Sequence, residues 1–146
     1  MARLAVLHMD ARHRGRPEAE HEAAVVSAEE LAEEFLARAS ELLESGWCQG
    51  ASARDAIGEP IDASSVFARR WSIGGALERV WRRGTFDPDV ALSAFVRASL
   101  ALAGTFGGDP QRWNDEEGRT LDQTLDALLD AEQLVNDRVE RLHPRR

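Results

Sequence analysis

The sequence contains no lysine and no tyrosine, and its only cysteine is Cys48. All 18 basic residues are therefore arginine. A single cysteine excludes an internal disulfide and a zinc site built on cysteines. No apolar run approaches the roughly 20 residues that span a bilayer. The apolar segment Leu4–Leu7 is shorter than the apolar region of a signal peptide. We therefore expect a cytoplasmic protein without a membrane segment.

Basic residues are also in the minority, with 26 Asp and Glu against 18 Arg and a net charge of −8. This balance argues against a broad basic face, which binding along a phosphate backbone requires. At 146 residues and 43% apolar content, the chain has the size and composition of one folded domain. We expect a partly flexible N-terminal arm over residues 1–26 and a single helical domain over residues 27–146.

Strong catalytic motifs are absent from the sequence. It has no phosphate-binding glycine loop, no Gly-x-Ser-x-Gly and no His-Glu-x-x-His. Three of the four histidines, His8, His13 and His21, have no metal-ligand spacing, so we expect no metal and no cofactor. Cys48 follows a helix C-terminus, where the helix dipole raises a thiol pKa, and we interpret it as a small buried hydrophobe. These features favour a non-enzymatic role without deciding it.

The first confident helix is predicted to start at Ser27, which opens a capping-box pattern, and to end before Gly46. Gly46 is placed to adopt a left-handed conformation after the helix. The next stretch lacks helical periodicity. A small hairpin with arms near 51–55 and 59–62 is predicted, with Gly58 at a positive-φ position in its turn.

Two further helices follow. One is predicted to begin at a cap within residues 62–65 and to end at Gly84. Its central Gly74 and Gly75 indicate that another backbone passes close by. The other is predicted from residue 88 to about residue 103, with Pro at its first position. It is apolar nearly all round, so we expect it to be buried on most faces.

The C-terminal third contains one short and one long helix. Asp109 and Pro110 predict a short turn through Trp113, and Thr120 opens a second capping box for a helix that runs to about Arg141. The predicted fold is mainly α. It is a compact bundle of four main helices plus one short helix, with a small β-hairpin after the first helix.

Two loops, each beside a tryptophan and a glycine, collect the polar residues that could form a site. The candidate ligand-binding residues are Trp47, Gln49, Arg54, Asp55, Trp113, Asn114, Asp115 and Arg119. If the loops converge, they form an aromatic-walled pocket in which the arginines hold an anion and Asp55 or Asp115 acts as acid or base. In the structural alternative, the same groups hydrogen-bond the loop backbones and the tryptophans fill the space beneath.

The same blocks carry a resemblance to a known family. They are Gly46-Trp47-Cys48-Gln49-Gly50, Ala53-Arg54-Asp55 with Gly58, Trp71-Ser72 with Gly75-Ala76-Leu77, and Trp113-Asn114-Asp115 with Gly118-Arg119-Thr120. Over about Ser27 to Ala131, the chain resembles a family of small actinobacterial and phage proteins catalogued only as a domain of unknown function. The resemblance implies a source of that kind and no established activity.

Three functions follow as hypotheses. The first is a non-catalytic interaction or regulatory protein that binds another protein, or itself, through its acidic surface and a helix face. The second is a small-molecule binder or accessory enzyme with its pocket between the 47–55 and 113–120 loops. The third and weakest is nucleic-acid binding through Arg12–Arg16 and Arg145-Arg146.

Overall fold

A computed structural model of the chain describes the backbone of residues 18–142 and the side chains of residues 27–142. Five helices and three short strands lie in this part of the chain. In chain order they are α2 (Glu18–Ser45), β1 (Ala53–Arg54), β2 (Pro60–Ile61), β3 (Arg70–Trp71), α3 (Ile73–Arg83), α4 (Pro88–Phe106), α5 (Pro110–Asn114) and α6 (Leu121–Leu142). The predicted fold class, mainly α with a hairpin after the first helix, is confirmed.

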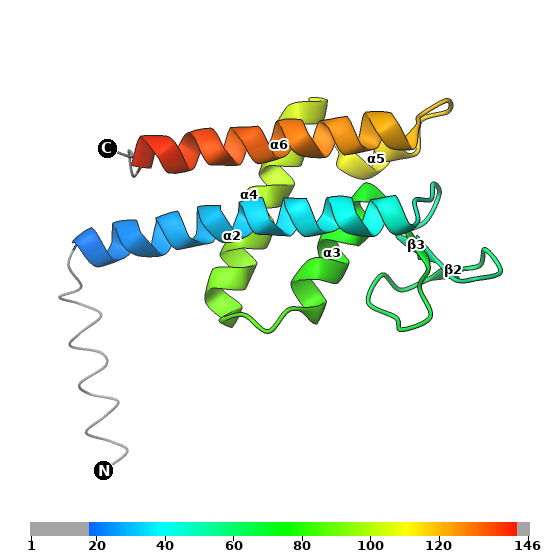
Figure 1. The fold of residues 1–146 in the computed structure, drawn as a ribbon, viewed down its shortest axis with the longest axis horizontal. Helices are drawn as coiled ribbons and strands as arrows, with labels where there is room; N and C mark the ends of the chain where they lie inside the picture. Colours follow the sequence, from blue (N-terminus) through cyan, green and yellow to red (C-terminus); the bar gives the residue numbers. More distant parts are fainter. Residues whose placement is uncertain (1–17, 143–146) are drawn as a thin grey trace, which may run out of the picture.

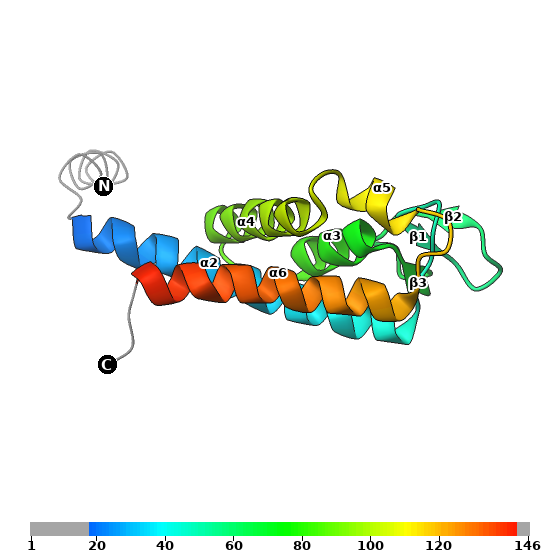
Figure 2. The same ribbon diagram turned by 90° about the horizontal axis from the view of Figure 1, so that it is seen from above.

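The helices form two layers. The long helices α2 and α6 lie side by side and antiparallel, and α3 and α4 cross behind them (Figures 1 and 2). The small sheet and α5 lie together at the end of the molecule where α2 ends and α6 begins (Figure 2). Both loops of the candidate site are therefore at the same end of the bundle.

The first helix is longer than predicted. It begins at Glu18, so Ser27 lies inside the helix and does not cap it. Residues 1–17 lie outside the described residues, and the division into an arm and a domain stays a prediction. Gly46 follows the helix as predicted, but it is not among the glycines with positive φ. It is required for space instead, because a Cβ there would overlap the carbonyl oxygen of Arg69.

The hairpin has the predicted place and turn. β1 pairs antiparallel with β2, and Gly58 in the connecting turn has φ of 90°. Asp55 Oδ1 accepts hydrogen bonds from the backbone N–H groups of Ile57 and Glu59, at 3.1 and 2.9 Å, which fixes the turn. β3, which was not predicted, pairs antiparallel with the other edge of β1 and completes a sheet of order β2-β1-β3.

The start of α3 corrects the prediction of a cap within residues 62–65. The helix begins at Ile73, and Ser72 caps it by accepting a hydrogen bond from the backbone N–H of Gly75. Val66 and Phe67, two apolar residues inside the span of the predicted helix, are exposed and lie before its true start. The apolar spacing misled because Trp71 is buried from strand β3 rather than from a helix.

Gly75 has the close backbone neighbour that its position predicted. A Cβ at Gly75 would overlap the carbonyl oxygen of Ser52, in the loop before β1. That carbonyl accepts a hydrogen bond from Ser72 N–H at 3.0 Å, so the loop is tied to the first turn of α3. A Cβ at Gly74 would meet only the end of the Gln111 side chain, at 3.3 Å.

The core lies where the two layers meet. Its largest fully buried apolar side chains are Phe35, Leu36 and Leu43 of α2, Ile73 and Leu77 of α3, Leu102 of α4, and Leu128 and Val135 of α6. The predicted short helix is present as α5, which ends at Asn114, one residue later than predicted. The capping box of α6 is also confirmed, because the side chains and backbone N–H groups of Thr120 and Gln123 bond reciprocally.

α4 differs most from its prediction. Its buried residues are mainly small, namely Ala91, Ala94, Ala98, Ala101 and Leu102. Its larger Leu92, Val96 and Leu100 are 51%, 47% and 60% exposed. The expectation that the helix is buried on most faces is therefore wrong. Alone among the described helices, α4 is long and apolar enough to cross a membrane, a criterion that core helices of soluble proteins also meet.

Candidate functional site

The backbone around β3 brings the first loop against α3. Gly46 O accepts a hydrogen bond from Trp71 N–H, and Cys48 N–H donates to Trp71 O, both at 3.0 Å. Trp47 and Trp71 form an isolated parallel bridge at the same place. The chain after α2 therefore runs beside the chain that enters α3. This arrangement positions Trp47, Cys48 and Gln49 toward α5.

Asn114, fully buried at the end of α5, joins the two loops. Its Oδ1 accepts hydrogen bonds from Trp47 Nε1 at 2.9 Å and from the backbone N–H of Ile73 at 3.0 Å. Its Nδ2 donates to Cys48 O at 3.1 Å and to Asp115 Oδ1 at 3.0 Å. All four hydrogen-bonding positions of the amide are thus used. One side chain holds the first loop, the start of α3 and α5 together.

Gln49 and Asp115 make a second set of bonds between the loops. Gln49 Nε2 donates to the carbonyl oxygens of Asn114 and Glu116, both at 2.9 Å. Asp115 Oδ1 accepts from the backbone N–H of Gly50 at 2.9 Å. The two predicted loops therefore converge, and their polar groups bond one another.

Ser72 and Gln111 belong to this cluster, although the sequence did not single them out. Ser72 Oγ donates to Gln111 Oε1 at 2.8 Å, and Gln111 Nε2 donates to both Asp115 carboxylate oxygens at 3.1 Å. Two local signals could have found them. Ser72 precedes a helical stripe as an N-cap does, and Gln111 stands four residues before Asp115 on a helix.

Asp115 is held as a carboxylate. Partial burial acts to raise its pKa, but hydrogen bonds from Gly50 N–H and from the Asn114 and Gln111 side chains outweigh that effect. Together with the positive charge of Arg54, they leave the pKa of Asp115 below its ordinary value. A carboxyl group with a lowered pKa is ionised at neutral pH and does not serve as a general acid there.

This pKa predicts a specific dependence of stability on pH. Because the folded-state pKa is depressed, the stabilisation by Asp115 is present above the unfolded-state pKa and is lost as pH falls through the folded-state pKa. Wild type should therefore be more stable than Asp115→Asn at pH 6, and the difference should shrink below about pH 4. Urea denaturation of both proteins across this range measures the difference. A difference that is constant over the range would contradict the role assigned to Asp115.

Arg54 and Asp55 serve the hairpin rather than the cluster. Arg54 donates to Gln49 O through Nε at 3.2 Å and Nη2 at 3.0 Å, and to Gly58 O through Nη1 at 2.9 Å. Asp55 is used within the hairpin turn. Arg54 thus fastens the first loop to the hairpin, while its charge still acts on Asp115.

Trp113 of α5 and Arg119 of the following loop form a stack next to the cluster. The Trp113 ring packs on Phe106, with centroids 4.1 Å apart, and the Arg119 guanidinium lies 3.7 Å from the Trp113 centroid. Arg119 also donates to Trp113 O at 3.0 Å and pairs with Glu116 at 2.6 Å. Both groups therefore have partners within the protein.

Cys48 is 5% exposed and its Sγ lies 3.8 Å from Ala51 O. Burial raises the pKa of its thiol, an effect that the charges of Arg54 and Arg70 only partly oppose. A thiol with a raised pKa is a poor nucleophile at neutral pH. Among the described residues, no group of three or more His, Cys, Asp and Glu is arranged to hold a metal ion.

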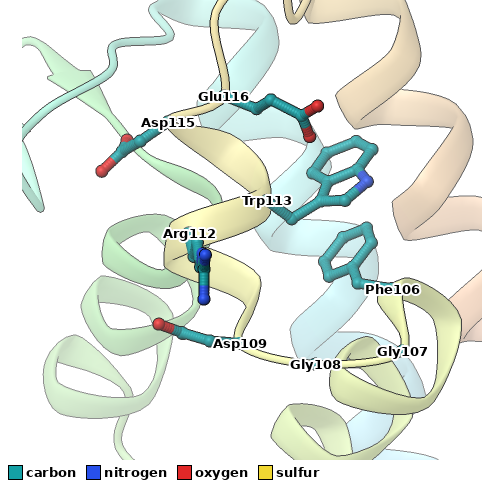
Figure 3. A pocket seen from close by; sticks show the side chains of 8 residues that line it. All are labelled: Phe106, Gly107, Gly108, Asp109, Arg112, Trp113, Asp115 and Glu116. Atoms are coloured by element: carbon teal, nitrogen blue, oxygen red, sulfur yellow. The ribbon is translucent and has the colours of Figure 1, made fainter.

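A surface hollow of about 840 Å³ lies beside α5 (Figure 3). Its lining residues are Phe106, Gly107, Gly108, Asp109, Arg112, Trp113, Asp115 and Glu116. Figure 3 shows the Phe106 and Trp113 rings facing each other at one side. The lining contains three carboxylates and one arginine and takes no residue from the 47–55 loop. A second hollow, of about 630 Å³, includes Gly50, Ala51 and Ser52 but no residue of the 113–120 loop.

Comparison with known protein families gives one match. The sequence profile of a family of unknown function, DUF6197, matches residues 27–134. The chain belongs to this family. The match confirms the resemblance seen in the sequence over almost the same residues. No curated protein and no solved structure matches the chain.

Membership in DUF6197 assigns no activity, so the ligand-binding role of the eight candidate residues stays a prediction. The structure unites Trp47, Gln49, Asn114 and Asp115 in one hydrogen-bond network, with Trp113 and Arg119 beside it. The arginine-rich segments proposed for nucleic-acid binding, Arg12–Arg16 and Arg145-Arg146, lie outside the described residues. An actinobacterial or phage source also stays a prediction.

Proposed function

We propose that this member of DUF6197 is a non-catalytic protein-binding module whose docking surface is one side of α4. We call this surface the α4 face and define it by Leu92, Val96 and Leu100. These residues recur every four positions and are about half exposed. An apolar helix stripe left open to solvent is the observation that carries the proposal, because such surfaces commonly mark protein interfaces.

The state of the loop cluster supports a non-catalytic role. The Asn114 amide, Gln49 and Asp115 are occupied by bonds to one another and to loop backbone. The pKa of Asp115 is lowered and that of Cys48 is raised, so neither group is prepared for acid–base or nucleophilic work. The cluster acts as a lock that sets the shape of this end of the bundle.

The distribution of charge supports one kind of partner. The α4 face carries no charged residue, and the only arginine of α4, Arg97, pairs at 3.0 Å with the buried Glu29 of α2. α4 packs against α2 and α6. α2 contains nine acidic residues and one arginine, and α6 contains six acidic residues and two arginines. The α4 face is thus an apolar stripe on a helix whose neighbours are acidic. An amphipathic helix with an apolar stripe and basic flanks is complementary to such a surface. A second copy of the chain would bring like charges together.

Two leucine substitutions test the α4 face. In Leu92→Gln/Leu100→Gln, glutamine keeps the helix propensity and removes apolar surface. Covering the exposed half of each leucine is worth about 1 kcal/mol. The double variant should therefore bind a synthetic Leu/Lys amphipathic helix roughly 30-fold more weakly than wild type. Fluorescence anisotropy with a labelled peptide gives both affinities.

The matched control is Ile57→Gln, which changes an 84% exposed residue in the turn between β1 and β2. This hairpin lies at one end of the molecule, away from α4 (Figure 2). The control variant should bind the peptide as wild type does. Equal affinity for the double variant and wild type, or no binding by wild type, would refute the proposal. Two other results would also refute it. One is a wild-type dimer in sedimentation that the double variant abolishes, because the α4 face would then bind a second copy. The other is wild-type binding to uncharged vesicles that the double variant abolishes, because the face would then bind a membrane.

A further inference from the structure

A third hollow, of about 650 Å³, lies between the C-terminal part of α2 and α3. We call it the α2–α3 hollow. Its lining residues are Arg38, Glu41, Leu42 and Ser45 of α2, with Arg79, Val80 and Arg83 of α3 and the following Gly84. Three arginines and one carboxylate line it, in a chain whose net charge is −8. The sign of charge here is thus opposite to that of the whole protein.

Two of these arginines bond carbonyl groups rather than carboxylates. Arg79 Nη1 donates to Ala63 O at 3.2 Å and to Ser65 O at 2.7 Å, and Arg83 Nη1 donates to Ser64 O at 3.1 Å. Within residues 27–142, neither arginine forms an ion pair. Neutral carbonyl groups position a guanidinium without cancelling its charge, so positive charge remains at the rim of the hollow.

Two neighbouring arginines, in contrast, form ion pairs with carboxylates. On the same helix, Arg82 pairs with Glu78 at 3.0 Å. Arg38, across the hollow on α2, pairs with Glu34 at 2.7 Å and lies 5.6 Å from the Phe86 ring centroid. Carboxylates were therefore available to this part of the fold, and Arg79 and Arg83 lack them.

The uncancelled charges crowd one another. Burial lowers the pKa of Arg79, and the positive charges of Arg83 and Arg69 lower it further. Within residues 27–142, Arg69 also bonds only carbonyl groups, those of Val66 and Ala68. Like charges held this closely repel, and a bound anion would relieve the repulsion.

The loop that these arginines hold has an unused polar group. Ser64 Oγ is buried and has no hydrogen-bond partner among the described residues. It belongs to the residue whose carbonyl Arg83 contacts. A buried hydroxyl without a partner is uncommon in a finished structure. Ser64 is not among the residues that line the α2–α3 hollow, and its hydroxyl is therefore not assigned as a ligand there.

We propose that the α2–α3 hollow binds a phosphate group, with Arg83 and Arg79 as its principal ligands. Guanidinium groups present forked N–H donors that match phosphate oxygens, and two of them cancel more than one unit of negative charge. The phosphate can belong to a soluble molecule or to a lipid headgroup, and both sources share this chemistry. This site is separate from the α4 face and does not depend on the proposed partner.

Arg83→Gln is the decisive variant. Arg79 is unsuitable because its guanidinium also lies 5.2 Å from the Trp71 centroid and secures a loop, whereas the side chain of Arg83 is exposed. The control is Arg112→Gln, which removes the same charge from an exposed arginine on α5. Thermal melting establishes that both variants are folded before binding is measured.

The probes are inorganic pyrophosphate, measured by calorimetry at low ionic strength, and vesicles of phosphatidylcholine with or without phosphatidylglycerol, measured by co-sedimentation. Wild type and Arg112→Gln should bind pyrophosphate, and Arg83→Gln should bind it about tenfold or more weakly. Binding to phosphatidylglycerol vesicles alone, lost in Arg83→Gln, supports the site and identifies a lipid source. The proposal is overturned if neither probe binds wild type, or if Arg83→Gln binds as wild type does.

Discussion

Replacing Asn114 by alanine is expected to lower the free energy of unfolding by about 3–5 kcal/mol, because a buried polar group left without its partner costs about 1–3 kcal/mol. The substitution removes the acceptor of Trp47 Nε1 and of Ile73 N–H, and the donor to Cys48 O. Four groups at one end of the bundle lose a partner in a single step, because Asp115 Oδ1 also loses its hydrogen bond from the amide. Such a loss is large for one side chain.

Urea denaturation followed by tryptophan fluorescence and circular dichroism measures this effect. The control is Asn136→Ala on α6, at a position that is only partly buried. It should change the free energy of unfolding by no more than about 0.5 kcal/mol. An Asn114→Ala protein as stable as the control would show that the amide does not lock the loops.

The second large effect is expected for Gly75→Ala. A Cβ at this position would overlap the carbonyl oxygen of Ser52, which is backbone and cannot move alone. Either the loop before β1 or the first turn of α3 must shift, and the hydrogen bond from Ser72 N–H to that carbonyl would be disturbed. We expect a loss of about 3 kcal/mol or more, as for overpacking in a rigid site.

Gly74→Ala provides the matched comparison one residue away. There a Cβ would meet only Gln111 Oε1, at 3.3 Å, and that side-chain end can shift. Alanine is also the better helix former by about 1 kcal/mol. The variant should therefore be as stable as wild type or slightly more so. Thermal denaturation of both variants measures the two changes in stability. Equal losses of stability would contradict the close approach of backbone at Gly75.

The sequence was sufficient for those elements whose signals are local. Asp87 and Asp109 with their following prolines mark the starts of α4 and α5, and Thr120 with Gln123 marks the start of α6. In each case a side chain bonds backbone within three residues, so no tertiary contact is needed to infer it. Gly58 in the hairpin turn is of the same kind.

Elements that depend on distant contacts were missed or misplaced. Strand β3 exists because Arg70 and Trp71 pair with β1, and two residues have no periodicity that could reveal a strand. The predicted helix therefore begins too early and includes Trp71, whereas α3 begins at Ile73. The start of α2 was misplaced because Ser27 fits a cap yet is equally acceptable inside a helix.

The exposed side of α4 illustrates a different limit. Hydrophobic periodicity counts apolar residues, and it weighs alanine far less than leucine. In α4 the alanines face the core, where small side chains let helices approach closely, and Leu92, Val96 and Leu100 face solvent. Sequence alone indicated the convergence of the loops as one of two alternatives, but the role of Asn114 as their common partner required the fold.

Amide chemical-shift mapping by NMR, with the Leu/Lys helical peptide titrated into the labelled protein, locates the binding surface. We expect the largest shifts along α4, at and around Leu92, Val96 and Leu100, with small shifts at the locked loops. Largest shifts at residues 47–55 and 113–120, with α4 unchanged, would contradict it and place the binding surface at the loop cluster instead.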